Sequence, residues 1–263
     1  MAGTTTAPAV LGNPGRFRRW LPYAAVLGME WRQTWRSWAY RVGLILLAVL
    51  ALGYLLHRAA IYHQAGIVQP ASALVAELFQ ASLILGPTLM VILSAGTITA
   101  ERGTLADSVL SRGISRFAYF LGKWQGRLAA LLSGWLALGA IVIFLAWVLL
   151  RHEDLSLLGS CWALGLLVSV LAAIGAVGIL FSALCPSTAL ALLLAWVVVH
   201  GAGAMLWLSA LTPLHPQALW SWFPLLVRGA YDTTAVLRAI GWAWLFAGLA
   251  AIVGTVHLAR CDL

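Results

Sequence analysis

LALLLAWVVVH, the stretch from Leu190 to His200, decides the fold class of this chain. It does not alternate apolar and polar residues, as a transmembrane β-strand would. A helix needs about 20 mostly apolar residues to cross a bilayer core roughly 30 Å thick. The stretch therefore predicts the centre of a membrane-spanning α-helix, which we place at residues 187–211.

The rest of the chain has the same apolar character. Its 263 residues are 62% hydrophobic and only 9% charged, and the mean hydropathy is +0.94. Soluble proteins carry roughly 25% charged residues. The sequence therefore predicts an all-α membrane protein with six transmembrane helices, at 42–57, 74–99, 124–150, 157–181, 187–211 and 236–258.

The residues before the first span divide into two parts. Residues 1–22 begin with small, uncharged residues and predict a flexible tail without a signal peptide. Residues 23–41 place Leu27, Trp31 and Trp35 four apart, and polar residues fill the positions between them. This pattern predicts an amphipathic interfacial helix, whose aromatic stripe faces either lipid headgroups or other protein. Residues 42–263 then form the membrane domain.

The charges of the chain indicate its orientation. The net charge is +8, from 15 arginines and one lysine against eight acids. With the N-terminus in the cytoplasm, the six-span arrangement puts all basic residues except Arg58, Arg151, Arg228 and Arg238 on the inner side. We therefore expect an integral protein of the bacterial inner membrane with both termini cytoplasmic, bound to membrane lipids and not to nucleic acid.

The segment 100–116, between the second and third spans, concentrates charge on the inner side. Gly103 allows a sharp turn, Thr104 can cap a new helix, and Asp107 suits that helix's N-terminus. The segment is either a solvated loop that anchors the topology or a surface helix on which a soluble partner docks. Its candidate docking residues are Glu101, Arg102, Gly103, Thr104, Leu105, Asp107, Val109, Leu110, Arg112 and Arg116.

The segment 212–235, before the last span, carries Pro213, Pro216 and Pro224. Prolines interrupt a long helix, and irregular backbone is not tolerated in contact with lipid. We therefore expect short re-entrant helices in the outer leaflet.

The charged segment resembles a known family. The residues E-R-G-T-L at Glu101–Leu105, S-R at Ser115–Arg116 and L-G-K at Leu121–Lys123 are similar to the coupling helix of type-2 ABC transporter permeases. The order of elements along nearly the whole chain is similar too. Arg112-Gly113 departs from the family, in which many members have a small residue and a proline.

This resemblance implies a permease that works as a homodimer or as a heterodimer with a related chain. Two cytoplasmic ABC ATP-binding subunits would dock on the coupling helices and would hold the ATP and Mg. The apolar spans favour a lipid-like or amphiphilic substrate, and the family likeness implies that this substrate is exported.

The chain has no Walker motif, so we expect no enzyme activity on it and ATP hydrolysis on a partner subunit. We also expect no cofactor and no metal on the chain, because the cysteines and histidines lack metal-ligand spacing. A metal role of His57 and His63 remains the alternative. Candidates for the pathway or a hinge are Glu77, Gln80, Pro87 and His200.

The alternative function is a stand-alone ion-coupled carrier or a membrane assembly factor, including a permease that serves maturation of a metalloenzyme. Carriers keep ionisable residues within their spans to bind the coupling ion. Apart from His200, the sequence offers none near the middle of a span, which favours the ABC permease.

Overall fold

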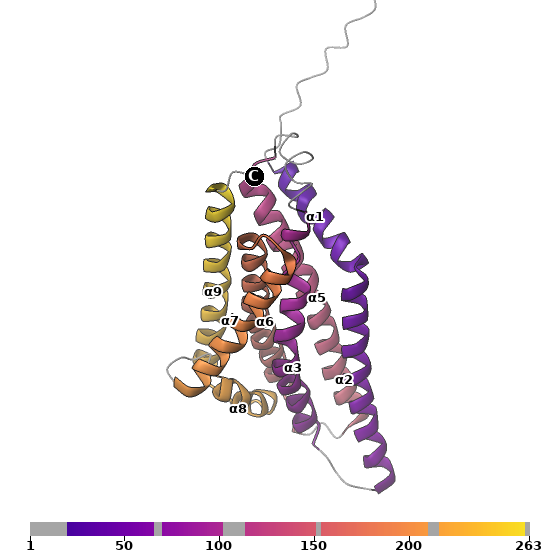
Figure 1. The fold of residues 1–263 in the computed structure, drawn as a ribbon. Helices are drawn as coiled ribbons and strands as arrows, with labels where there is room; N and C mark the ends of the chain where they lie inside the picture. Colours follow the sequence, from indigo (N-terminus) through magenta and orange to yellow (C-terminus); the bar gives the residue numbers. More distant parts are fainter. Residues whose placement is uncertain (1–19, 66–69, 102–113, 151–153, 210–215, 261–263) are drawn as a thin grey trace, which may run out of the picture.

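The computed structural model describes residues 20–65, 70–101, 114–150, 154–209 and 216–260 (Figure 1). Its helices are α1 (Leu21–Arg36), α2 (Trp38–Ala65), α3 (Ala71–Ser94), the short 3-10 helix η1 (Thr99–Glu101), α5 (Arg116–Leu149), α6 (Leu157–Leu184), α7 (Thr188–Ser209), α8 (Pro216–Val227) and α9 (Thr233–Arg260).

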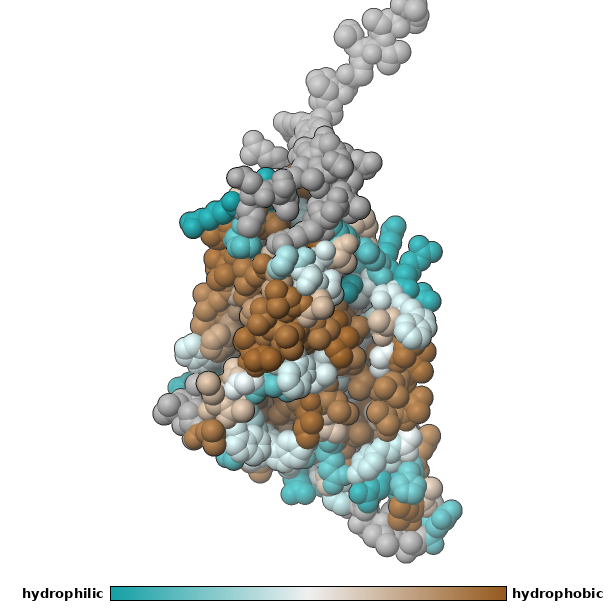
Figure 2. All heavy atoms as spheres, viewed as in Figure 1, coloured by the Kyte–Doolittle hydropathy of each residue, from teal (hydrophilic) through white to brown (hydrophobic). Residues whose placement is uncertain are grey.

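Six helical stretches among the described residues are long and apolar enough to cross a membrane. They are Trp38–Ile61, Ala71–Glu101, Arg116–Leu149, Leu157–Leu184, Thr188–Leu208 and Thr233–Arg260. The all-helical fold with six spans is thereby confirmed for this part of the chain. Figure 2 shows the matching surface, with hydrophobic side chains around the middle and hydrophilic side chains toward both ends.

Several helix boundaries differ from the sequence prediction. The end of the first span, for example, is predicted at residue 57, while α2 ends at Ala65. Two of the differences lie near the start of α2 and the start of α5. The break after α1 falls at Ser37, whose backbone is extended, and not after residue 41. The helix α5 begins at Arg116, not at residue 124. Both differences lengthen a helix toward the polar end of the bundle, because backbone hydrogen bonds continue past the apolar run that marks the span in the sequence.

The helix α6 forms the centre of the bundle. It packs against α3, α5, α7, α8 and α9. In its most apolar stretch of 18 residues, 61% of the residues are buried, against 11% in the corresponding stretches of α2 and α7. The face that α9 buries consists mainly of alanines, including Ala239, Ala243 and Ala247. Small residues let helix backbones approach closely where no hydrophobic effect drives association.

The two ends of the bundle carry different elements. The start of α1 and the end of α9 lie at one end, at the top of Figure 1, while α8 lies at the other. The short helix α8 packs on α3 and α6. Of the predicted tail at 1–22, residues 1–19 lie outside the described residues, whereas Leu21 and Pro22 are not tail but the first residues of α1. Of the predicted coupling segment 100–116, residues 102–113 lie outside the described residues.

Candidate functional site

The candidate site begins with the close crossing of α1 over α5. Gly122 and Gly126 lie one helical turn apart on α5, under α1. A Cβ atom on Gly122 would lie 3.0 Å from Val26 Cγ1, and one on Gly126 would lie 2.8 Å from the carbonyl oxygen of Leu27. The two glycines therefore let α1 lie almost backbone to backbone on α5.

This crossing buries charged side chains. Lys123 Nζ lies 3.0 Å from Glu30 Oε2 of α1 and 2.6 Å from Glu101 Oε1 of η1. The side chain of Lys123 is 1% exposed and that of Glu30 is 2% exposed. Lys123 Nζ also donates a hydrogen bond to the carbonyl oxygen of Thr97, at 3.2 Å.

Arg127, one turn further along α5, extends the group. Its Nη1 lies 3.3 Å from Glu30 Oε1 and donates to Thr34 Oγ1 at 3.0 Å. Its Nε and Nη2 donate to the carbonyl oxygen of Leu93 at 3.0 and 2.7 Å. We call Glu30, Glu101, Lys123 and Arg127 the ion-pair cluster.

The ion-pair cluster is balanced in charge. It pairs two carboxylates with two cations, and Tyr119 Oη donates to the remaining oxygen of Glu101 at 3.0 Å. Buried ions are strongly destabilising when unpaired. Both cations also bind backbone carbonyls at the C-terminal end of α3, where carbonyls lack helical partners and favour positive charge.

A second set of hydrogen bonds holds the end of α3 from the other side. Ser182 Oγ on α6 accepts from the backbone N–H of Ile98 at 2.8 Å and of Thr99 at 3.1 Å. Thr99 Oγ1 also lies 2.9 Å from Thr188 Oγ1 at the start of α7. The turn between α3 and Glu101 is therefore fixed directly to α5, α6 and α7, and through Lys123 and Arg127 to α1.

Of the predicted docking residues, the structure describes Glu101 and Arg116. Glu101 belongs to the ion-pair cluster and is the last described residue before the segment 102–113. Arg116 begins α5 after that segment, and Ser115 caps the helix by accepting from the Ala118 N–H at 3.2 Å. The other predicted docking residues lie outside the described part: Arg102, Gly103, Thr104, Leu105, Asp107, Val109, Leu110 and Arg112.

Glu77 and Gln80 lie toward the other end of the bundle and contact different helices. Glu77 accepts a hydrogen bond from Tyr54 Oη, and its Oε2 lies 4.0 Å from Arg58 Nη2, both on α2. Gln80 Nε2 donates to the carbonyl oxygen of Trp220 on α8 at 2.8 Å.

Pro87 lies within α3, and the next residue, Thr88, meets His200. His200 Nε2 lies 3.1 Å from Thr88 Oγ1. The imidazole ring stacks on the Trp196 ring, with the two ring centroids 4.4 Å apart. His200 is thus bonded to a neighbouring helix. The structure does not bring it together with Glu77 or Gln80.

Sequence reasoning missed most of the ion-pair cluster. It placed Glu30 among the polar residues of an interfacial helix, used Arg127 only as an indicator of orientation, and used Lys123 for orientation and for the family resemblance. The available signal was the repeat of Gly122 and Gly126 around the sole lysine of the chain, since small residues a turn apart indicate a close helix contact.

Among the described residues, no group of three or more His, Cys, Asp or Glu side chains is placed to hold a metal ion. No family model matches the chain, and no curated protein matches it.

Proposed function

We propose that this chain is the transmembrane permease subunit of an ATP-driven transporter of the type-2 ABC class. It forms the substrate pathway as a dimer, and a separate ATP-binding subunit docks on the segment 100–116. The proposal rests on the sequence resemblance of that segment together with the six spans.

The ion-pair cluster is the observation that carries the proposal. A coupling segment has to transmit the movement of a soluble subunit to the spans. This requires that the segment be rigidly attached where it leaves the bundle. Glu101, at the start of the segment, is fastened through Lys123 to α5 and to α1. A displacement of Glu101 would therefore move α1, α3 and α5 together.

The spans favour a lipid-like or amphiphilic substrate. The charged groups of the described spans lie mainly near the bundle ends, and the contact of His200 with Thr88 involves no charged partner among the described residues. A strongly ionic substrate would need charged or polar partners along the path. Export follows from the family resemblance.

An ion-coupled carrier is the second candidate, and buried Glu30 is the observation that favours it. A proton-coupled carboxylate must change its partner during the cycle. Glu30 is paired with two cations at once. This arrangement favours a permanent structural contact over a carboxylate that exchanges partners. Uptake or efflux in vesicles that collapses with a protonophore while ATP is absent would support this candidate.

Co-purification tests the ABC proposal. Tagged protein, extracted from its native membranes in mild detergent, should bring down a polypeptide with Walker A and ABC signature motifs, identified by mass spectrometry. Leu105→Arg should abolish this association, because it replaces an apolar residue of the predicted docking segment with a charged one. Gln64→Arg, an exposed change outside the segment, is the matched control and should retain it.

Two outcomes contradict the proposal. If no ATP-binding subunit co-purifies with the unmodified chain, the chain is not such a permease. If the subunit co-purifies equally with Leu105→Arg, the segment 100–116 is not its docking site.

A further inference from the structure

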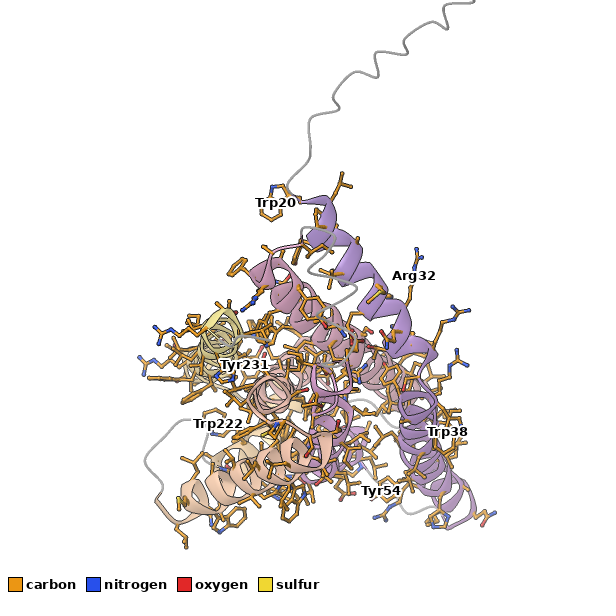
Figure 3. All side chains as sticks on the ribbon, turned by 45° about the horizontal axis from the view of Figure 1, so that its top comes forward. Trp20, Arg32, Trp38, Tyr54, Trp222 and Tyr231 are labelled. Atoms are coloured by element: carbon orange, nitrogen blue, oxygen red, sulfur yellow. The ribbon has the colours of Figure 1, made fainter. Side chains whose placement is uncertain are left out.

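The outward face of α1, opposite Glu30, has no neighbour among the described helices. The described residues that line one continuous hollow on this face are Ala24, Ala25, Gly28, Met29, Arg32, Gln33, Arg36 and Ser37. A Cβ atom on Gly28 would meet nothing within 4 Å. In Figure 3, Arg32 points away from the helix bundle. The face therefore combines open space next to the backbone with exposed side chains.

This face is positively charged without compensation. Arg32 and Arg36 are exposed and lie one helical turn apart. Neither has an acidic partner among the described residues. Glu30, the single acid of α1, lies on the opposite side and is neutralised by Lys123 and Arg127. The hollow therefore favours a ligand with negative charge.

The position along the bundle places this charge beside the hydrocarbon. The helix α2 starts at Trp38, and its exposed apolar face begins at Val42 and continues at Ile45, which is 62% exposed. Trp38 is 78% exposed, and indole rings favour the headgroup layer. Figure 2 shows hydrophilic side chains over the junction of α1 and α2, next to the hydrophobic band. Arg32 and Arg36 therefore lie at the level of lipid phosphates.

We infer that the outward face of α1 is a binding site for anionic phospholipids of the adjacent leaflet. Arg32 and Arg36 hold the phosphate, whose negative charge is not offset by a cationic headgroup in an anionic lipid such as phosphatidylglycerol. Gly28 and Ala25 leave room for the headgroup against the helix. The acyl chains extend along Val42 and Ile45 of α2.

The exposed tryptophan and the adjoining apolar face of α2 favour a lipid over an acidic protein partner. The chain's own residues 1–19 are an unsuitable occupant, because their charged residues, Arg16, Arg18 and Arg19, are all basic. The site is independent of the proposed transport function, and its test measures lipid alone.

The test is native mass spectrometry of the full chain, reconstituted in phosphatidylcholine with one fifth phosphatidylglycerol and then extracted in mild detergent. The unmodified chain should retain phosphatidylglycerol in preference to phosphatidylcholine. Arg32→Gln with Arg36→Gln should reduce the retained phosphatidylglycerol about tenfold, since two phosphate contacts are lost. Arg238→Gln with Arg260→Gln, two exposed arginines of α9, is the matched control and should leave retention unchanged.

A second variant tests the space rather than the charge. Gly28→Leu fills the open position on an exposed face and keeps both arginines, and it should also reduce phosphatidylglycerol retention. Equal retention of both lipids by the unmodified chain would overturn the inference, as would an equal loss in the α9 control. Loss of a protein partner in the Arg32 and Arg36 variant, with phosphatidylglycerol retention unchanged, would assign the face to that protein instead.

Discussion

At the scale of single residues, Lys123 is the centre of the candidate site. It touches both Glu30 of α1 and Glu101 of η1. Arg127 reaches Glu30 but serves mainly to bind carbonyl and hydroxyl oxygens of Leu93 and Thr34. The two cations therefore differ in their contacts. Lys123 connects the two carboxylates, and Arg127 binds the end of α3.

Lys123→Met should destabilise the protein by about 3–5 kcal/mol, because it keeps the side-chain bulk but leaves a buried carboxylate short of its partner. Thermal unfolding can be followed by the reaction of buried Cys185 with a thiol dye, in a chain with Cys161→Ser and Cys261→Ser. Adding Glu30→Gln to Lys123→Met should recover part of the loss. An unchanged unfolding midpoint in Lys123→Met would contradict the role of the cluster.

Gly126→Val should separate α1 from α5. Its Cβ would lie 2.8 Å from the Leu27 carbonyl oxygen and 3.0 Å from Glu30 Cβ, and backbone atoms cannot yield without moving the helix. Amide hydrogen exchange in residues 21–36 should become faster. Gly165→Ala, where a Cβ meets nothing within 4 Å, is the control and should leave this exchange unchanged. Equal exchange in the two variants would show that the crossing does not depend on Gly126.

At the scale of elements, the helices were largely predictable and their contacts were not. Apolar runs such as Leu190 to His200 predict a membrane-spanning helix by themselves, because a span requires only consecutive apolar residues. The stripe of Leu27, Trp31 and Trp35 left open whether lipid headgroups or protein face it, and it did not identify Val26, Glu30 and Thr34 as the residues that α1 buries. Burial of Glu30 depends on Lys123 and Arg127, far along the chain, and periodicity does not report such pairing.

The short helix α8 is held to the bundle by specific polar contacts. Gln80→Leu removes the hydrogen bond from Gln80 Nε2 to the Trp220 carbonyl oxygen, which is worth about 1 kcal/mol. Amide exchange in residues 216–227 should therefore become about fivefold faster. Ser82→Ala on the same helix, whose hydroxyl donates only within α3 to the Leu78 carbonyl oxygen, should not change it. Unchanged exchange in Gln80→Leu would show that apolar packing alone holds α8.

The start of α9 should depend on pH through Asp232. Its carboxylate accepts from the Thr234 N–H at 2.8 Å, and this backbone hydrogen bond lowers the pKa of Asp232. Because the folded pKa lies below the unfolded one, the stabilisation of the first turn is present above the unfolded pKa and is lost as pH falls through the folded pKa. Carboxyl carbon NMR of the four aspartates, assigned with Asp232→Asn, should show Asp232 titrating below the ordinary value. Titration at or above that value would show that the cap is not formed.

At the scale of the whole molecule, an even number of crossings returns the chain to its starting end. The start of α1 and the end of α9 lie together in Figure 1, in agreement with the even count of spans. The ion-pair cluster lies toward that end, and the contacts of α8 lie at the other. The proposed docking of a soluble ATP-binding subunit on the segment 100–116 would require this end to face the cytoplasm.

Single cysteines test this orientation in a chain whose own cysteines are replaced by serine. Arg260→Cys at the end of α9 should react with a membrane-impermeant maleimide only after the cells are permeabilised. Thr233→Cys at the start of α9, which is exposed, should react in intact cells. The positive charge concentrated toward the end that carries α1 predicts this result, because basic residues are retained on the cytoplasmic side. The reverse labelling pattern would place the segment 100–116 outside the cell, where no ATP-driven subunit could dock, and would refute the proposed function together with the orientation.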